Sequence, residues 1–304
     1  MSTSDLAELY TFINAQGWSY RTGKPVPYGE QVLISAGAQT ATLNYYPKRG
    51  RFVVGGTDTV LRRRIERWIA ERSEVPAADL GRIALETAQI GLDESGKGDW
   101  FGPLVVAAVY VEPSQAAALT AAGVRDSKTV GAQTLPRIAE AIERLVPAQR
   151  RFVLALMPEA YNQRYAAYNN INLLLATLYS EAALPIWQTT QSTAIVCDQF
   201  SQRADRLDSA FASAGMPKPT QYHHAESRSI AVAAASILAS TRFGAELQVL
   251  GRKAGLNGAL PRGASAIYEL QHAARTIIAH EGREGLARYA KLNFKPVQAL
   301  LETG

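Results

Sequence analysis

The stretch that decides the fold runs from residue 91 to residue 103. It reads Gly91-Leu92-Asp93-Glu94-Ser95-Gly96-Lys97-Gly98-Asp99-Trp100-Phe101-Gly102-Pro103. An apolar segment at 89–92 leads into it and a β-branched run at 104–111 follows it, so the pattern predicts two buried strands joined by a glycine-rich loop. Asp93 and Glu94 stand where the first strand is expected to end. Because adjacent strand residues point to opposite faces, both carboxylates converge only if the strand ends or bends there.

The same stretch has part of the spacing of a phosphate-binding P-loop, at Gly91, Gly96 and Lys97. The residues that would contact the phosphates and the metal ion do not fit that interpretation. Gly98 stands where such a loop needs a metal-binding hydroxyl, and Asp93 with its acidic neighbour would place two negative charges beside the bound phosphates. The sequence therefore disfavours a nucleotide hydrolase of the P-loop class.

Two more acids occupy comparable positions. Asp198 directly follows the apolar run 194–197, and Glu226 lies at the first turn of an alanine-rich helix predicted over 225–241. Open α/β sheets gather functional groups at strand ends and helix starts. Four carboxylates brought together would repel one another unless a multivalent cation lay among them, and oxygen ligands suit Mg²⁺ or Mn²⁺. Each acid also has an ordinary explanation as a loop cap, a turn residue or a helix N-terminal charge, and spacing alone leaves both interpretations open.

The rest of the second half of the chain alternates between strand and helix patterns. Strands are predicted at 151–157 and 193–197, and helices at 170–180, 225–241, 265–280 and 283–290. Strands followed by helices indicate an α/β core.

The first half has a different pattern. Strands are predicted at 31–35, 39–46 and 51–54, and an amphipathic helix over 60–69 completes a small α+β unit. Residues 73–81 break the periodicity with a proline and a glycine, which makes them the best linker in the chain, and we set the domain boundary near 85.

Cations and aromatic residues alternate in this first unit. Tyr45, Lys48, Arg49 and Arg51 surround one turn, and four arginines follow on the predicted helix. Such a surface can bind nucleic acid by neutralising phosphates and stacking on bases. The alternative is a solvated charged face.

Composition sets wider limits. The chain has 304 residues with 47% hydrophobic and 19% charged residues, which excludes a disordered or collagen-like protein. The net charge of +5 is only a modest basic excess. The single cysteine, Cys197, agrees with a reducing compartment. We expect neither a signal peptide nor a membrane span, and we expect a soluble cytoplasmic protein.

The stretch 91–103 closely resembles the first motif of the prokaryotic type 2 ribonucleases H, and its Asp-Trp-Phe-Gly-Pro continuation is more similar to the HIII branch than to the HII branch. Further motifs recur in the same order and carry the resemblance over about residues 88–296. These are Arg125-Asp126-Ser127-Lys128, Tyr161-Asn162, Asn169-Asn170, Asp198, Ala225-Glu226-Ser227 with 231–237, and Leu260-Pro261-Arg262-Gly263-Ala264-Ser265.

The resemblance implies a fold, a site and a cofactor. It implies a ribonuclease H-like catalytic domain at 86–304, with a mixed sheet flanked by helices, preceded at 1–85 by a domain similar to the TATA-binding protein. In the family, four acids ligate two Mg²⁺ or Mn²⁺ ions, which carries over to Asp93, Glu94, Asp198 and Glu226. Glu226 fits the HIII set, because HII enzymes have Asp at that position.

The resemblance also implies substrate contacts. They are Gly96, Lys97, Gly98, Lys128 and Asn170 in the catalytic domain, and Tyr45, Lys48, Arg49 and Arg51 in the N-terminal domain. A solvated loop lysine is the alternative for Lys128. Two positions depart from the family pattern, Tyr179 and Asn293, where many relatives have histidine, and we expect them to affect rate or substrate preference.

The implied activity is hydrolysis of the RNA strand of RNA/DNA hybrids by two metal ions, leaving 5′-phosphate and 3′-hydroxyl ends. The implied partner is the hybrid duplex, bound by a monomer without an obligate protein partner. Two alternatives remain. One is HII-like cleavage at single embedded ribonucleotides, and the other is a hybrid-binding protein without catalysis.

Overall fold

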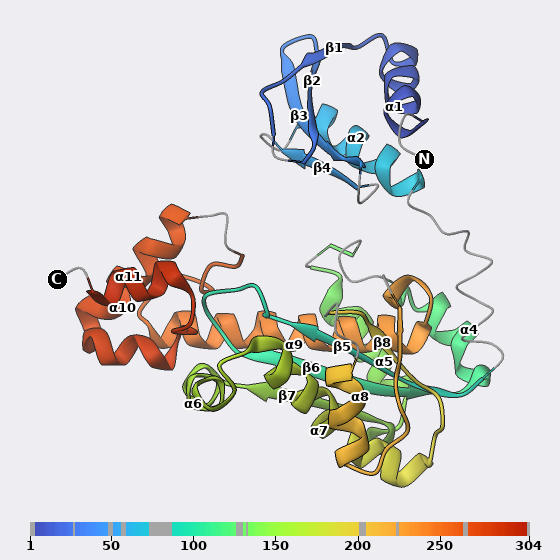
Figure 1. Cartoon of the computed structure of the whole chain (residues 1–304), viewed down its shortest axis with the longest axis vertical. Helices are drawn as coiled ribbons and strands as arrows, with labels where there is room; N and C mark the ends of the chain where they lie inside the picture. Colours follow the sequence, from blue (N-terminus) through green and yellow to red (C-terminus); the bar gives the residue numbers. More distant parts are fainter. Residues whose placement is uncertain are drawn as a thin grey trace. The chain divides into compact units, whose positions relative to one another are not determined.

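The computed structural model divides the chain into two compact units, residues 1–76 and 77–304 (Figure 1). It describes residues 4–26, 28–47, 51–55, 59–72, 87–125, 130–131, 133–200, 205–222, 225–263 and 267–302. The boundary predicted near 85 falls within 73–86, outside the described residues. Each unit has its own hydrophobic core, with no buried residue shared between them among those described.

The N-terminal unit is an antiparallel sheet with two helices. Its elements are α1 (Ser4–Ala15), β1 (Ser19–Thr22), β2 (Glu30–Ala36), β3 (Gln39–Tyr46), β4 (Arg51–Gly55) and α2 (Val60–Arg72). The strands pair in chain order. Alternation along β3 buries Leu43 and Tyr45 on the face that also carries Val32 and Ile34 of β2, where α2 packs. The small α+β unit expected from the sequence is confirmed.

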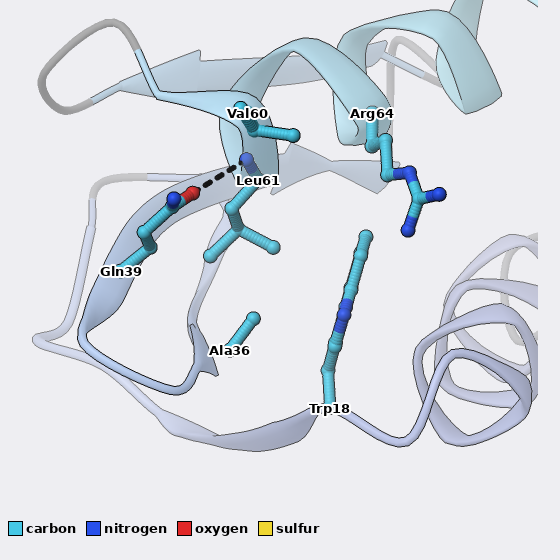
Figure 2. Close-up of a pocket in the computed structure, with 6 residues that line it drawn as sticks. All are labelled: Trp18, Ala36, Gln39, Val60, Leu61 and Arg64. Carbon is cyan, nitrogen blue, oxygen red and sulfur yellow. Dashed lines mark hydrogen bonds between the residues drawn. The ribbon is translucent and has the colours of Figure 1, made fainter.

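One shallow pocket of about 200 Å³ lies in this unit (Figure 2). Arg64 extends from α2 toward the indole of Trp18 at its rim. Among its lining residues, the side chain of Gln39 accepts a hydrogen bond of 2.9 Å from the backbone N–H of Leu61. No Asp or Glu is among the residues that line this pocket, and all four predicted acids belong to the second unit.

The second unit is built on a mixed five-stranded sheet. Its strands are β5 (Gln89–Ser95), β6 (Leu104–Val111), β7 (Arg151–Leu156), β8 (Ile195–Asp198) and β9 (Thr220–Tyr222). Their order is β7-β6-β5-β8-β9, with β5 parallel to β8 and antiparallel to β6. The predicted α/β class with a mixed sheet is confirmed. Because β5 and β8 run in parallel, their carboxyl ends meet at one edge of the sheet.

Helices cover both faces of this sheet (Figure 1). They are α4 (Pro113–Ala121), α5 (Leu135–Leu145), α6 (Pro158–Tyr168), α7 (Ile171–Thr190), α8 (Asp205–Ser213), α9 (Ile230–Lys253), α10 (Ile267–Gly285) and α11 (Lys295–Glu302), with short 3₁₀ turns η3 (Ala148–Arg150), η4 (Ala225–Ser227) and η5 (Leu286–Arg288). Val105 and Ala107 of β6 share a core with α9, whereas Leu104 and Val106 share one with α7. The helices α9 and α7 therefore lie on opposite faces.

Gly91 explains how closely α9 approaches β5. A Cβ atom at Gly91 would lie 2.2 Å from the backbone of Ala231 and Val232, so only glycine allows this contact. By length and composition α9 could cross a membrane, but 67% of its most apolar window is buried inside the unit. It is the core helix of the second unit.

Several predicted helices differ from the structure, and the helix predicted over 170–180 continues to Thr190 as α7. The helix predicted over 225–241 begins only at Ile230, because the side chain of Ser229 caps its N-terminus by accepting a hydrogen bond from the N–H of Val232. The helix predicted over 283–290 is not one helix, because α10 ends at Gly285 and the 3₁₀ turn η5 follows; the break predicted between 280 and 283 is present at Gly282, whose φ is +72°. The strand predicted at 193–197 is β8, two residues later at its start.

Candidate active site

The predicted strand end at Asp93 and Glu94 is wrong. Strand β5 continues through both residues to Ser95, which pairs with Val105 of β6. Because the ladder is unbroken there, the two side chains follow the alternation of a strand and point to opposite faces. Asp93 accepts a hydrogen bond from Ser236 of α9, whereas Glu94 accepts one from the hydroxyl of Tyr179 of α7.

Asp198 and Glu226 complete the acidic cluster. Asp198 is the last residue of β8, and its Oδ1 accepts a hydrogen bond of 3.3 Å from the backbone N–H of Ala225. This contact brings the 3₁₀ turn η4, with the buried Glu226, to the carboxyl end of the strand. The negative charge of Glu226 acts on Asp93 across the site. The fold thus gathers all four predicted acids at one edge of the sheet.

Asp93 is the acid of this cluster whose pKa is raised by its surroundings. Burial raises the pKa of Asp93 well above its usual range, and the carboxylates of Glu94 and Glu226 raise it further. Hydrogen bonds from Ser236 and from the N–H of Glu94, at 2.8 Å from Oδ1, oppose the shift. The site therefore concentrates more negative charge than its own donors neutralise.

The described residues do not form a closed metal cage. Among them, no three Asp, Glu, His or Cys side chains are arranged to hold one ion together. Asp93 is hydrogen-bonded to Ser236 of α9, and Glu94 to Tyr179 of α7. The predicted ligand set of two ions stays a prediction, supported by charge and donor type.

The glycine-rich turn after β5 lies beside these acids. Gly96 has a φ of +92°, and a Cβ atom there would lie 2.4 Å from the carbonyl oxygen of Pro103. Gly98 is exposed with open space around its Cα. Lys97 lies over the ring of Phe200, with Nζ 5.0 Å from its centroid. Burial lowers the pKa of Lys97, and the carboxylates of Glu94 and Asp198 act in the opposite direction.

The other predicted substrate contacts fare differently. Tyr45 is fully buried in the core of the N-terminal unit and packs on Phe52, because the alternation of β3 turns it inward, so we correct its prediction as a surface contact. The side-chain oxygen of Asn170 caps α7 by accepting from the N–H groups of Asn172 and Leu173. Lys48, Arg49 and Lys128 lie outside the described residues, as does the side chain of Arg51.

Sequence reasoning missed two polar residues that hold the acids. Tyr179 was expected to affect rate, but not to donate a hydrogen bond to Glu94. Ser236 was treated only as part of an apolar helix. The available signal in the sequence was one polar residue inside a run of small apolar residues. In the structure Ser236 is only 4% exposed, and buried polar groups are found where they have a partner.

Given the expected role of Glu94 as a metal ligand, replacing Tyr179 by phenylalanine is expected to lower the metal-dependent turnover that the family resemblance implies. Burial raises the pKa of the Tyr179 hydroxyl, and the charges of Glu94 and Asp93 raise it further, so the group stays protonated as a donor. Removing a hydrogen-bond partner of a metal-ligating carboxylate costs about 10- to 100-fold in metal affinity or activity. The measurement is cleavage rate against Mg²⁺ and Mn²⁺ concentration. Tyr179→His keeps a donor and is the matched control, and equal rates for Phe and wild type would contradict the role.

Comparison with known proteins places this geometry in a family. The family model described as Ribonuclease HII matches residues 90–297. Ribonuclease HIII of Protochlamydia amoebophila (strain UWE25) is 34% identical over 215 residues, 71% of this chain and 69% of that protein. Ribonuclease HIII of Bacillus cereus (strain 03BB102) is 30% identical over 285 residues, 91% and 82% of the two chains.

A solved structure agrees over both units. The crystal structure of Bst-RNase HIII in complex with Mn²⁺ superimposes with a TM-score of 0.65 at 28% identity, covering 97% of this chain and 96% of that one. The match includes the N-terminal unit, which the family model leaves out. The chain therefore belongs to the ribonuclease HII family, and within it to the ribonucleases HIII.

Proposed function

We propose that this chain is an endonuclease that hydrolyses the RNA strand of RNA/DNA hybrids. The observation that carries the proposal is the gathering of Asp93, Glu94, Asp198 and Glu226 at the shared edge of β5 and β8 in a chain of the ribonuclease HIII family. The four acids act as metal ligands. The products are 5′-phosphate and 3′-hydroxyl ends, as the family resemblance implies.

The residues present suit hard divalent cations. Their donors are carboxylate oxygens, and the raised pKa of Asp93 reflects burial and repulsion that a cation would relieve. The four acids would hold two Mg²⁺ or Mn²⁺ ions, which would supply activation of water and stabilisation of the leaving oxygen. Within the chain, Ser236 and Tyr179 orient Asp93 and Glu94, and the N–H of Ala225 orients Asp198.

Substrate recognition belongs to the turn beside the acids and to the N-terminal unit. The open Gly98 lets the backbone approach a nucleic-acid strand closely, and the ribose 2′-hydroxyl is what distinguishes RNA from DNA there. Lys97 places a positive charge at the same edge. Lys128, Asn170, Lys48, Arg49 and Arg51 complete the proposed contacts. The protein acts as a cytoplasmic monomer without an obligate protein partner.

The direct test is cleavage of two end-labelled duplexes, a continuous RNA/DNA hybrid and a DNA duplex with one ribonucleotide. Each is incubated with Mg²⁺, Mn²⁺ or EDTA. Multiple metal-dependent cuts in the continuous hybrid alone are expected. Cutting only beside the single ribonucleotide would replace the proposal with HII-like activity, and no cutting of either duplex would replace it with a binding function.

A further inference from the structure

Lys291 is a fully buried lysine that the reaction outlined above does not use. Its side chain has no exposed surface, which is rare for a lysine. Nζ donates hydrogen bonds to the backbone carbonyl oxygens of Asp99 at 3.1 Å, Phe101 at 3.4 Å and Gly102 at 2.8 Å. An ammonium group has three N–H donors, and here each has a carbonyl acceptor in the loop that follows the Gly96–Gly98 turn.

The backbone around Lys291 is joined to the same loop. The N–H of Lys291 donates to the carbonyl of Trp100 at 2.8 Å, and the N–H of Gly102 donates to the carbonyl of Tyr289 at 2.9 Å. Phe101 and Ala290 form an antiparallel bridge between them. The loop Asp99–Gly102 is thus joined to the segment 289–291 by backbone hydrogen bonds, and the Lys291 side chain adds three further hydrogen bonds to the same loop.

The segment that carries Lys291 is itself fixed from α6. The amide of Asn162 donates to the carbonyl oxygens of Ala287 at 3.2 Å and Ala290 at 2.9 Å, and its oxygen accepts from the N–H of Leu292 at 2.9 Å. Tyr161 next to it donates its hydroxyl to Asn293 at 3.1 Å. Helix α6 therefore holds the segment 287–293 in place, and Lys291 joins this segment to the loop Asp99–Gly102.

Filling this space would not by itself require a lysine. Burial lowers the pKa of Lys291 to about 7, with Asp99 acting in the opposite direction, so the folded protein bears the cost of a desolvated ammonium group. An apolar side chain would fill the space between the rings of Tyr161 and Phe243 without that cost. Lysine supplies what an apolar residue does not, three donors for three inward-facing carbonyls.

We propose that Lys291 is a positioning residue that clamps the loop Asp99–Gly102 to the C-terminal segment and thereby fixes the Gly96–Gly98 turn beside the acidic cluster. The inference rests on the proposed hydrolysis of hybrids at that cluster. Loosening the clamp leaves the four acids in place but lets the turn that meets the substrate move.

The test uses Lys291→Met in the full chain, which keeps the length of the side chain and removes its donors. We expect amide hydrogen exchange in a peptide covering 96–103 to rise about tenfold or more, with exchange in β3 unchanged. We expect kcat on the hybrid to fall about 10- to 100-fold, the loss caused by small misplacement of reacting groups, with KM within about threefold. Lys253→Met, at the exposed end of α9, is the matched control for loss of one positive charge.

A second variant, Asn162→Ser, removes hydrogen bonds to the segment 287–293 and leaves the loop Asp99–Gly102 unchanged. It provides the test if Lys291→Met does not fold. The same changes are expected at smaller size. Faster exchange with unchanged kcat, lost kcat with unchanged exchange at 96–103, or faster exchange throughout the chain would each overturn the clamp. A wild-type protein that does not cut hybrids would refute the proposed function instead, while the exchange measurement would still test the clamp.

Discussion

Asp93→Asn is expected to abolish cleavage of RNA/DNA hybrids and to stabilise the metal-free protein. A bound metal contributes several kcal/mol of transition-state stabilisation, so losing Asp93, one of the proposed ligands, is expected to lower kcat by about 10²-fold or more. The same substitution removes a charge that is buried near Glu94 and Glu226. With EDTA present we expect the melting temperature of the second unit to rise by about 2–4 °C per kcal/mol of relieved repulsion.

The gain in stability of Asp93→Asn over the wild type is expected to depend on pH. The pKa of Asp93 is raised in the folded protein by burial, Glu94 and Glu226, relative to the ordinary value of 3.8. Between those two pKa values the folded state binds more protons than the unfolded state, so wild-type stability falls as the pH rises through this window. Asparagine does not titrate. The advantage of the variant should therefore be small near pH 4 and grow toward neutral pH, as measured by thermal unfolding in EDTA.

Glu159→Gln is the matched control, because Glu159 is an exposed acid on α6. It should change neither cleavage nor the pH dependence of the melting temperature. Near wild-type cleavage by Asp93→Asn would remove Asp93 from the site. Loss of cleavage without any gain in stability would mean that the acids do not repel one another as the structure indicates.

Deleting residues 1–76 is expected to weaken binding to the hybrid and flatten its salt dependence. The N-terminal unit carries the basic turn around Arg51, and its core is separate from the cores of the second unit. Each lost phosphate contact lowers the slope of log K against log salt by about 0.9, so losing three cations lowers it by about 2 to 3. Affinity at low salt should fall about tenfold or more. The measurement is fluorescence anisotropy titration at several salt concentrations in the Asp93→Asn background.

A triple variant, with Lys48, Arg49 and Arg51 replaced by glutamine, separates these charges from the rest of the unit. It should reproduce most of the change in slope while both units remain folded by circular dichroism. If the deletion leaves affinity and slope unchanged, the N-terminal unit does not contribute to hybrid binding. If only the triple variant is without effect, other residues of the unit make the contacts.

Local patterns in the sequence determined the elements that position the site. The apolar run before Asp93 and the β-branched run after Pro103 predicted β5 and β6, because buried strands are continuous apolar segments. The order of motifs indicated the family, and the apolar run before Asp198 predicted the strand that became β8, although Asp198 ends that strand and Glu226 lies in η4 ahead of α9. These properties depend on neighbours in the chain, so the sequence alone suffices for them.

Only the tertiary structure decided how the acids are held. Glu94 meets Tyr179 across 85 residues of chain, and Lys291 meets Asp99 across 192. Such separations carry no geometric information, because many folds could bring either pair together or keep it apart. The continuation of β5 to Ser95 was likewise set by pairing with β6, which turned the two adjacent acids to opposite faces. Packing between residues far apart in the chain, absent from any local pattern, thus fixed the directions of the Asp93 and Glu94 side chains.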